Sequence, residues 1–125
     1  MSGLVLVVDD SVVLRSSVKF TLEEAGYEVA EADNGKTGLD KVKELMLAGK
    51  RPGMIISDVN MPVMDGITFI KELKQGAGKF IPVLVLTTES QPAMKQAGKE
   101  AGAAGWLVKP FKNDQLIQVV RKFVR

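Results

Sequence analysis

The sequence contains no cysteine and no histidine. Without cysteine there is no disulfide framework, which fits a reducing compartment, so we expect a cytoplasmic protein. Without histidine the chain lacks the commonest metal ligand and the commonest general base. Any chemistry must therefore use carboxylates, hydroxyls, amides and lysines.

Long apolar runs and an excess of one charge are also missing. No apolar run approaches the roughly 20 residues of a membrane span. The opening segment, MSGLVLVVDD, lacks the basic flank and long apolar stretch of a secretory signal. The 17 basic and 15 acidic residues leave a net charge of +2, which is too balanced to favour nucleic acid. We therefore expect neither a membrane nor a nucleic acid as a partner.

The 125 residues have an ordinary globular composition and suit one domain over residues 1–125. Five short apolar runs alternate with segments in which apolar residues recur at helical spacing. The runs are Leu4–Val8, Tyr27–Glu31, Met54–Ser57, Ile81–Leu86 and Gly105–Val108. Glycines at positions 26, 49 and 76 are expected to end the first three helices. The fourth helical segment, from Pro92, has a weak apolar stripe, and we expect it to be the least stable helix.

This alternation predicts an α/β fold, in which five helices cover both faces of a five-stranded parallel sheet. The first, third and fourth runs are continuously apolar, as strands covered on both faces should be. The second run carries Glu28 and Glu31 and the fifth is short, so both are expected at the edges. The doubly wound order 2-1-3-4-5 satisfies this. Right-handed crossovers would place helices 1 and 5 on one face and helices 2, 3 and 4 on the other.

Polar residues follow four of the five runs. They are Asp9 and Asp10 after the first, Asp58 after the third, Thr87, Thr88 and Glu89 after the fourth, and Lys109 after the fifth. Because the carboxyl ends of parallel strands share one edge, we expect these side chains in one pocket. Clustered carboxylates tend to stay protonated unless a cation intervenes, and an all-oxygen set suits Mg²⁺. A lysine and a threonine hydroxyl beside that ion favour a phosphoryl group, with the central Asp58 as its acceptor.

Taken singly, each of these residues has an ordinary structural interpretation. Helix caps often contain pairs such as Asp10-Ser11 and Asp65-Gly66. A strand can end in threonines such as Thr87-Thr88, and a lysine such as Lys109 is usually solvated. Their shared edge is what favours a functional pocket over these alternatives. The segment GAGKF at 76–80 is not a phosphate loop, because Leu73 stands where the first glycine belongs and Phe80 replaces the Ser or Thr.

Four motifs make the chain resemble the receiver domains of two-component response regulators, most of all stand-alone CheY-like receivers. The motifs are VVDDS after the first strand, the third-strand aspartate followed by NMPVMDG, VLTTE after the fourth strand, and Lys-Pro-Phe after the fifth. The resemblance extends over essentially the whole chain. It implies that Asp58 accepts a phosphoryl group from a phosphohistidine on a partner histidine kinase.

The resemblance also implies a ligand set. Asp10 and Asp58 would bind Mg²⁺ directly together with the backbone carbonyl of Asn60, and Asp9 would act mainly through water. Lys109 would contact one phosphoryl oxygen, and the peptide bond from Lys109 to Pro110 would be cis. Thr87 would hydrogen-bond another phosphoryl oxygen, helped by backbone amides near Asn60 and Thr88.

For switching, the resemblance assigns Thr87 and Trp106. Thr87 would move toward the phosphoryl group, and Trp106 would then turn inward from an exposed position. The alternative is that Trp106 is a plain edge-strand aromatic packed on the fourth helix. Asn60 and Glu89 would tune the lifetime of the phosphate. The expected output face, formed by helix 4, strand 5 and helix 5, includes Met94, Lys95, Lys99, Trp106, Gln118 and Lys122.

The resulting hypothesis is a monomeric, phosphorylation-activated signalling switch, which we expect to act in chemotaxis. It would catalyse only its own aspartyl phosphorylation and dephosphorylation, and so would not be an enzyme acting on other substrates. Its output would be contact with a downstream protein, such as a flagellar motor switch component or a kinase or phosphotransfer protein. One alternative is the receiver fragment of a larger regulator. Others are a pseudo-receiver and a small Asp- and Mg²⁺-dependent phosphatase, although Asp9 and Asp10 are adjacent and do not form the D-x-D motif of that class.

Overall fold

The computed structural model describes residues 3–124, in which five strands alternate with five helices. The strands are β1 (Leu4–Val8), β2 (Glu28–Ala32), β3 (Met54–Ser57), β4 (Val83–Thr87) and β5 (Gly105–Val108). The helices are α1 (Val12–Glu24), α2 (Gly35–Leu47), α3 (Gly66–Lys74), α4 (Pro92–Ala101) and α5 (Asn113–Phe123). All strand pairs are parallel, and the order is β2-β1-β3-β4-β5, which confirms the predicted fold and strand order.

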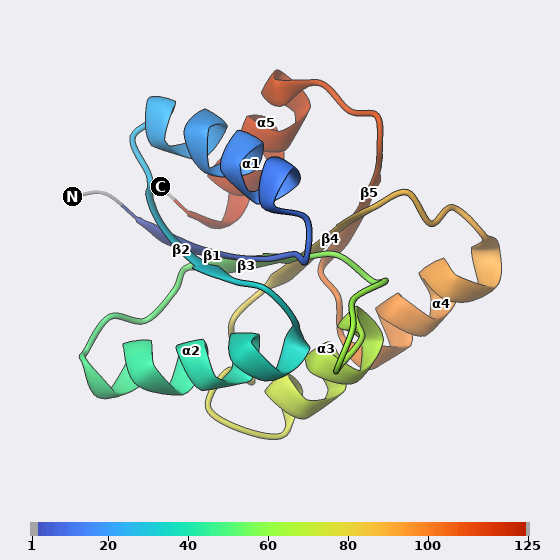
Figure 1. Ribbon diagram of the computed structural model, residues 1–125, viewed down its shortest axis with the longest axis horizontal. Helices are drawn as coiled ribbons and strands as arrows, with labels where there is room; N and C mark the ends of the chain where they lie inside the picture. The colour runs from blue at the N-terminus through green and yellow to red at the C-terminus, as the bar shows by residue number, and fades with distance from the viewer. Residues whose placement is uncertain (1–2, 125) are drawn as a thin grey trace.

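The helices form two layers around the sheet. In Figure 1, α1 and α5 cover one face, and α2, α3 and α4 cover the other, as the crossover rule predicts. A hydrophobic core lies on each face of the sheet. Alternate residues of β1 pack into one core or the other, because successive side chains of a strand point to opposite faces. Val5 and Val7 join the core under α1 and α5, whereas Leu6 and Val8 join the core with Phe69 of α3.

Burial separates the central strands from the edge strands. Every residue of β1, β3 and β4 is buried. In contrast, β2 begins with the exposed Glu28, and β5 contains no fully buried residue. The predicted edges are therefore confirmed. The three buried strands, β1, β3 and β4, lead to the polar residues Asp9, Asp58 and Thr87.

Two predicted strands, Tyr27–Glu31 and Ile81–Leu86, differ from the observed β2 and β4 by one or two residues at each end. The fourth strand begins at Val83 because Ile81 closes a turn, with its N–H donating to the Gly78 carbonyl at 3.0 Å. Pro82, which follows, has no N–H to offer a sheet ladder. The second strand begins at Glu28 because the Tyr27 N–H bonds back to the end of α1, at the Leu22 carbonyl.

The helix ends follow the predicted signals closely. Gly26 and Gly49, just beyond α1 and α2, have φ values of 95° and 73°. Asp65 caps α3, with its side chain accepting from the Thr68 N–H at 2.9 Å. In α4 only Gly98 and Ala101 are buried, and its start has no side-chain cap. That α4 is the least stable helix stays a prediction, which the small size of these two buried residues supports.

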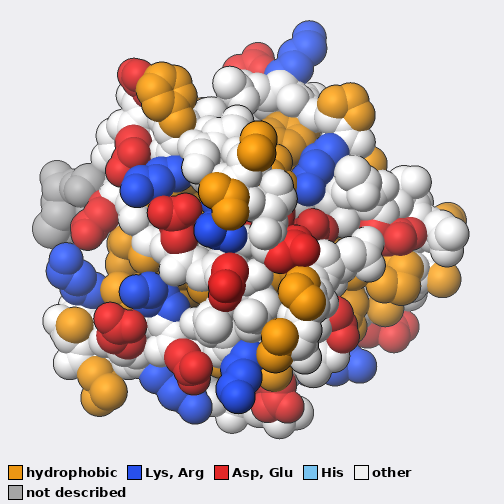
Figure 2. Space-filling model, in the orientation of Figure 1, with side chains coloured by type: hydrophobic (Ala, Val, Ile, Leu, Met, Phe, Trp, Pro, Cys, Tyr) orange, Lys and Arg blue, Asp and Glu red, His pale blue; other side chains and the backbone are white. Residues whose placement is uncertain are grey.

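The surface carries no broad area of one charge on the side that Figure 2 shows. Red and blue side chains are interspersed there, in keeping with the near-balanced net charge of +2. Among residues 3–124, no helix combines the length and apolar character that crossing a bilayer requires.

Candidate functional site

Three carboxylates meet at the carboxyl ends of β1 and β3. One oxygen from each of Asp9, Asp10 and Asp58 lies within 4.8 Å of the others. The sheet register causes this meeting, because Val8 and Ser57 are paired and the next residues are Asp9 and Asp58. The Asp58 N–H extends that pairing by donating to the Val8 carbonyl at 3.1 Å.

Asp9 is the most enclosed member of the cluster, with 3% of its surface exposed. Its Oδ1 accepts from the Ser11 N–H at 2.8 Å. Burial raises the pKa of Asp9 above its ordinary value; the hydrogen bond from Ser11 and the Lys109 charge oppose this, and the charges of Asp58 and Asp10 add to it. A cation bound beside these carboxylates would favour the ionised form of Asp9.

Asp58 is held firmly and faces a lysine. Its side chain is 13% exposed; Oδ1 accepts from the Val59 N–H at 2.6 Å, and Oδ2 lies 3.7 Å from Lys109 Nζ. The Ser57 hydroxyl donates to the Asp58 carbonyl at 2.8 Å. Gly66 packs so closely on the same carbonyl that a Cβ at position 66 would collide with it.

Lys109 reaches the cluster from the edge strand β5. Its N–H donates to the Thr87 carbonyl at 2.8 Å, and the peptide bond to Pro110 is cis, as the resemblance implies. The side chain is 20% exposed and places Nζ 3.7 Å from Oδ2 of Asp58 and 3.9 Å from Oδ2 of Asp9. The ammonium therefore balances part of the charge of two carboxylates.

Thr87 is fully buried at the end of β4, on the same rim of the sheet. Its hydroxyl oxygen accepts from the Glu89 N–H at 3.1 Å. A hydroxyl that accepts in this way still has a hydrogen to donate. Of the other predicted residues in these loops, Asn60 and Thr88 are exposed and Glu89 is half-buried.

Trp106 does not occupy the exposed position that we expected. The residue is half-buried, and its Nε1–H donates to the Glu89 carbonyl at 3.1 Å. The ring lies against Gly98 of α4, where a Cβ would come within 2.5 Å of Cζ3. The missing side chain at position 98 makes room for the indole, and the Glu89 carbonyl supplies the partner that a buried N–H requires.

The predicted output face is only partly a free surface. Met94 is half-buried and packs against the core beneath α4, whereas the other members on α4 and α5 are exposed. The exposed members are Lys95, Lys99, Gln118 and Lys122. A groove of about 450 Å³ runs between α4 and β5, and its walls include Lys95, Lys99 and Trp106.

Sequence analysis missed Arg15, which touches the acidic loop directly. Its Nη1–H donates to the Asp9 carbonyl at 2.6 Å. A single arginine on an amphipathic helix is ordinarily solvated, so its spacing from the acidic pair carried no recognisable signal.

The family model of the response regulator receiver domain matches residues 5–121. This chain belongs to that family. It is therefore a receiver domain of the two-component response regulators, as the four motifs predicted.

The curated relatives of the receiver differ in length. The response regulator MprA of Mycobacterium tuberculosis is 38% identical over 125 residues, which cover 100% of this chain and 52% of that protein. The receiver thus spans about half the length of these relatives. The chemotaxis protein CheY of Bacillus subtilis is 35% identical over 123 residues, covering 98% of each chain.

Solved structures agree with the fold. Chemotaxis protein CheY4 of Vibrio cholerae is 46% identical with a TM-score of 0.88, and the match covers 98% of this receiver and 99% of that chain. The receiver domain of sensor histidine kinase PA1611 from Pseudomonas aeruginosa has a TM-score of 0.87 at 23% identity over 98% of each chain, a likeness of fold alone. That protein was crystallised with a magnesium ion coordinated in its active site cleft.

Proposed function

We propose that this receiver is a phosphorylation-activated switch, which accepts a phosphoryl group onto Asp58 from a phosphohistidine of a histidine kinase. The observation that carries the proposal is the placement of Lys109 Nζ 3.7 Å from Asp58, within a cluster that also contains Asp9 and Asp10. The chain has no histidine, so the donor imidazole would belong to the partner.

The residues present fit a magnesium ion. The donors are oxygens alone, and burial together with neighbouring carboxylates raises the pKa of Asp9, so a dication would stabilise the ionised cluster. Asp10, Asp58 and the carbonyl of Asn60 would hold the ion directly, with Asp9 acting mainly through water. When bound, the ion would supply positive charge to the carboxylates and to the phosphoryl oxygens.

The transfer itself is a displacement at phosphorus. A carboxylate oxygen of Asp58 attacks the phosphorus, and a P–O bond forms as the P–N bond of the phosphohistidine breaks. The electron pair of that bond leaves with the imidazole nitrogen of the donor. Lys109 balances the charge of one phosphoryl oxygen, and the Thr87 hydroxyl donates to another, helped by backbone N–H groups near Asn60 and Thr88.

A short chain of contacts supports the switching role. The Thr87 hydroxyl accepts from the Glu89 N–H, the Glu89 carbonyl accepts from Trp106, and the Trp106 ring packs on Gly98 of α4. A pull on the Thr87 hydroxyl from the phosphoryl group would disturb the Glu89 peptide, and with it the indole and the weakly held α4. Asn60 and Glu89, beside the site, would set the lifetime of the phosphate.

We further propose that the switch acts in chemotaxis in the cytoplasm. The match to Bacillus subtilis CheY over nearly the full length of both chains supports this. The downstream partner would be a flagellar motor switch component, or a kinase or phosphotransfer protein, docking on the groove between α4 and β5 and on the exposed Lys122 of α5. A role as the receiver portion of a longer regulator is the second candidate, supported by the match to half of MprA.

Phosphorylation can be tested by intact mass after incubation with acetyl phosphate and Mg²⁺. The wild type should gain one phosphoryl group, and Asp58→Asn should gain none. Asp65→Asn is the matched control, because the Asp65 carboxylate is engaged in capping α3 at Thr68. Equal labelling of Asp58→Asn and wild type would refute the assignment of the acceptor. Sustained turnover of p-nitrophenyl phosphate would instead favour a phosphatase.

A further inference from the structure

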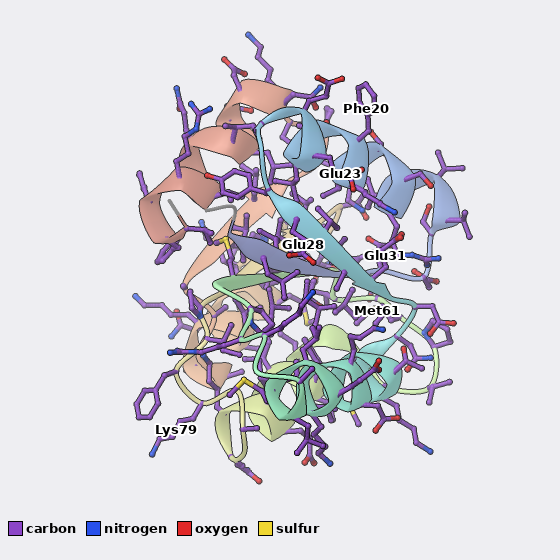
Figure 3. All side chains as sticks on the ribbon, turned by 90° about the vertical axis from the view of Figure 1, so that its left-hand side faces the viewer. Phe20, Glu23, Glu28, Glu31, Met61 and Lys79 are labelled. Carbon is purple, nitrogen blue, oxygen red and sulfur yellow. The ribbon has the colours of Figure 1, made fainter. Side chains whose placement is uncertain are left out.

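Arg15 ties three elements together beside the acidic cluster. It lies in the first turn of α1, yet its side chain is only 16% exposed. Nη1–H donates to the Asp9 carbonyl at 2.6 Å, and Nε lies 3.4 Å from Oε1 of Glu31. Figure 3 shows Glu31 on the edge strand β2, on the side of the sheet where α1 lies. One guanidinium thus joins α1, β2 and the loop after β1.

Apart from its 3.9 Å ion pair with Lys109, the Asp9 residue is held by three hydrogen bonds, and only one of these comes from the side chain of another residue. Its N–H donates to the Ala32 carbonyl at 3.1 Å, and its Oδ1 accepts from the Ser11 N–H at 2.8 Å. The third contact is the hydrogen bond from Arg15 to its carbonyl. Arg15 is therefore the one contact in this set that a substitution can remove without altering the backbone.

We propose that Arg15 is a positioning residue for the metal site, because it holds the Asp9 peptide so that the carboxylates of Asp9 and Asp10 stay close to that of Asp58. This inference rests on the proposed function, since it concerns the affinity of the site for Mg²⁺. A small octahedral ion tolerates little error in ligand placement. Without Arg15 the peptide between Asp9 and Asp10 loses a charge-assisted restraint, and both carboxylates gain freedom.

Glu31 has a supporting part, and Lys19 provides a matched control. Glu31 orients Arg15 and also lies 3.5 Å from the Lys19 ammonium. Lys19 lies one turn farther along α1, and within residues 3–124 its ammonium forms a hydrogen bond and ion pair with Glu31 alone. Loss of Lys19 removes a cation from the same network but leaves the contact with Asp9 in place.

The test is a titration with MgCl₂, followed by the amide NMR signals of residues 9–11 and 58–60. Arg15→Met should bind Mg²⁺ about 10-fold more weakly than wild type, the size typical of residues that orient metal ligands. Arg15→Lys should fall between them, because a lysine offers a point charge rather than a fork that bridges two partners. Glu31→Gln should lose about threefold, as expected for a half-exposed ion pair. Lys19→Met should match wild type.

A second readout separates positioning from general stability. In acetyl phosphate assays, the Mg²⁺ concentration for half-maximal phosphorylation should rise in Arg15→Met by the same factor as the dissociation constant. The rate at saturating Mg²⁺ should return to the wild-type value. A purely structural role would lower the melting temperature while leaving the half-saturating Mg²⁺ concentration unchanged, and that result would overturn the inference.

The remaining outcomes also decide the question. Wild-type affinity in Arg15→Met, or an equal loss in Lys19→Met, would overturn the inference while the proposed function stands. If Arg15→Met does not fold, wild type, Glu31→Gln and Arg15→Lys are compared instead. Their affinity for Mg²⁺ should decrease in that order. A wild-type protein that binds no Mg²⁺ would overturn both the inference and the proposed function.

Discussion

The packing of Trp106 on α4 makes a sharp prediction for Gly98→Ala. A Cβ at position 98 would lie 2.5 Å from Cζ3 and 2.9 Å from Cε3 of the indole. Carbon atoms in contact normally lie about 3.5–4.0 Å apart, so the ring must withdraw by about 1 Å. The hydrogen bond from Trp106 to the Glu89 carbonyl, now 3.1 Å, would be stretched or broken.

Two opposing contributions set the change in the free energy of unfolding. Overpacking against the ring should cost about 1–3 kcal/mol. Replacing glycine by alanine within a helix should recover about 1 kcal/mol. In a Trp106→Ala background only the second contribution remains, because the next neighbour, Ile67 Cδ1, is at an ordinary 3.6 Å. The coupling between positions 98 and 106 should therefore be about 1–3 kcal/mol.

This double-mutant cycle consists of the wild type, Gly98→Ala, Trp106→Ala and the double variant. Urea unfolding followed by circular dichroism gives the free energy of unfolding of each. Trp106 is the sole tryptophan, so its emission in Gly98→Ala reports the ring directly and should shift to longer wavelength. If Gly98→Ala is stabilising by the same amount in both backgrounds and the emission maximum does not move, the described packing of Trp106 is wrong.

Substitutions at three further positions test other parts of the structure. Burial raises the pKa of Asp9, so as the pH is lowered the native state takes up a proton at a higher pH than the unfolded chain does. The free energy of unfolding therefore falls as pH rises from the unfolded-state pKa of Asp9 through its native-state pKa. Asp9→Asn should therefore raise the free energy of unfolding of the metal-free protein at neutral pH and weaken Mg²⁺ binding; a gain that persists in acid, where Asp9 is protonated, would contradict the stated cause. Val63 is 78% exposed with φ 69°, so Val63→Asn should stabilise the fold by about 1 kcal/mol in urea unfolding, and Val63→Ala by less. Gly66→Ala would place a Cβ into the Asp58 carbonyl and 2.8 Å from Val59 Cα, and should cost about 3 kcal/mol and slow phosphorylation; unchanged stability would show that the loop before α3 is not packed as described.

The architecture was predictable because its determinants are local and repeated. Continuous apolar runs predict buried parallel strands, and Glu28 and Glu31 predict an edge. The meeting of Asp9 and Asp58 follows from the same pattern, because neighbouring parallel strands end on one side of the sheet. No side-chain detail was needed for either conclusion.

The features that sequence analysis missed depend on tertiary contacts. The inward position of Trp106 requires the space above Gly98 and a free carbonyl at Glu89, which lie on two other segments. The contact between Arg15 and Asp9 depends on the side chain turning back along α1 rather than outward to solvent. The start of β4 depends on the turn that ends at Ile81. None of these has a periodic signature in the chain.

The central claim is that Asp9, Asp10, Asp58, Thr87 and Lys109 form one magnesium-assisted phosphoryl site. A crystal structure with Mg²⁺ and beryllofluoride tests it most directly. The account predicts beryllium on an Asp58 oxygen, the ion among the three carboxylates, and fluorides in contact with Lys109 Nζ and the Thr87 hydroxyl. Beryllofluoride bound at another carboxylate, or an ion bound away from Asp10 and Asp58, would contradict it.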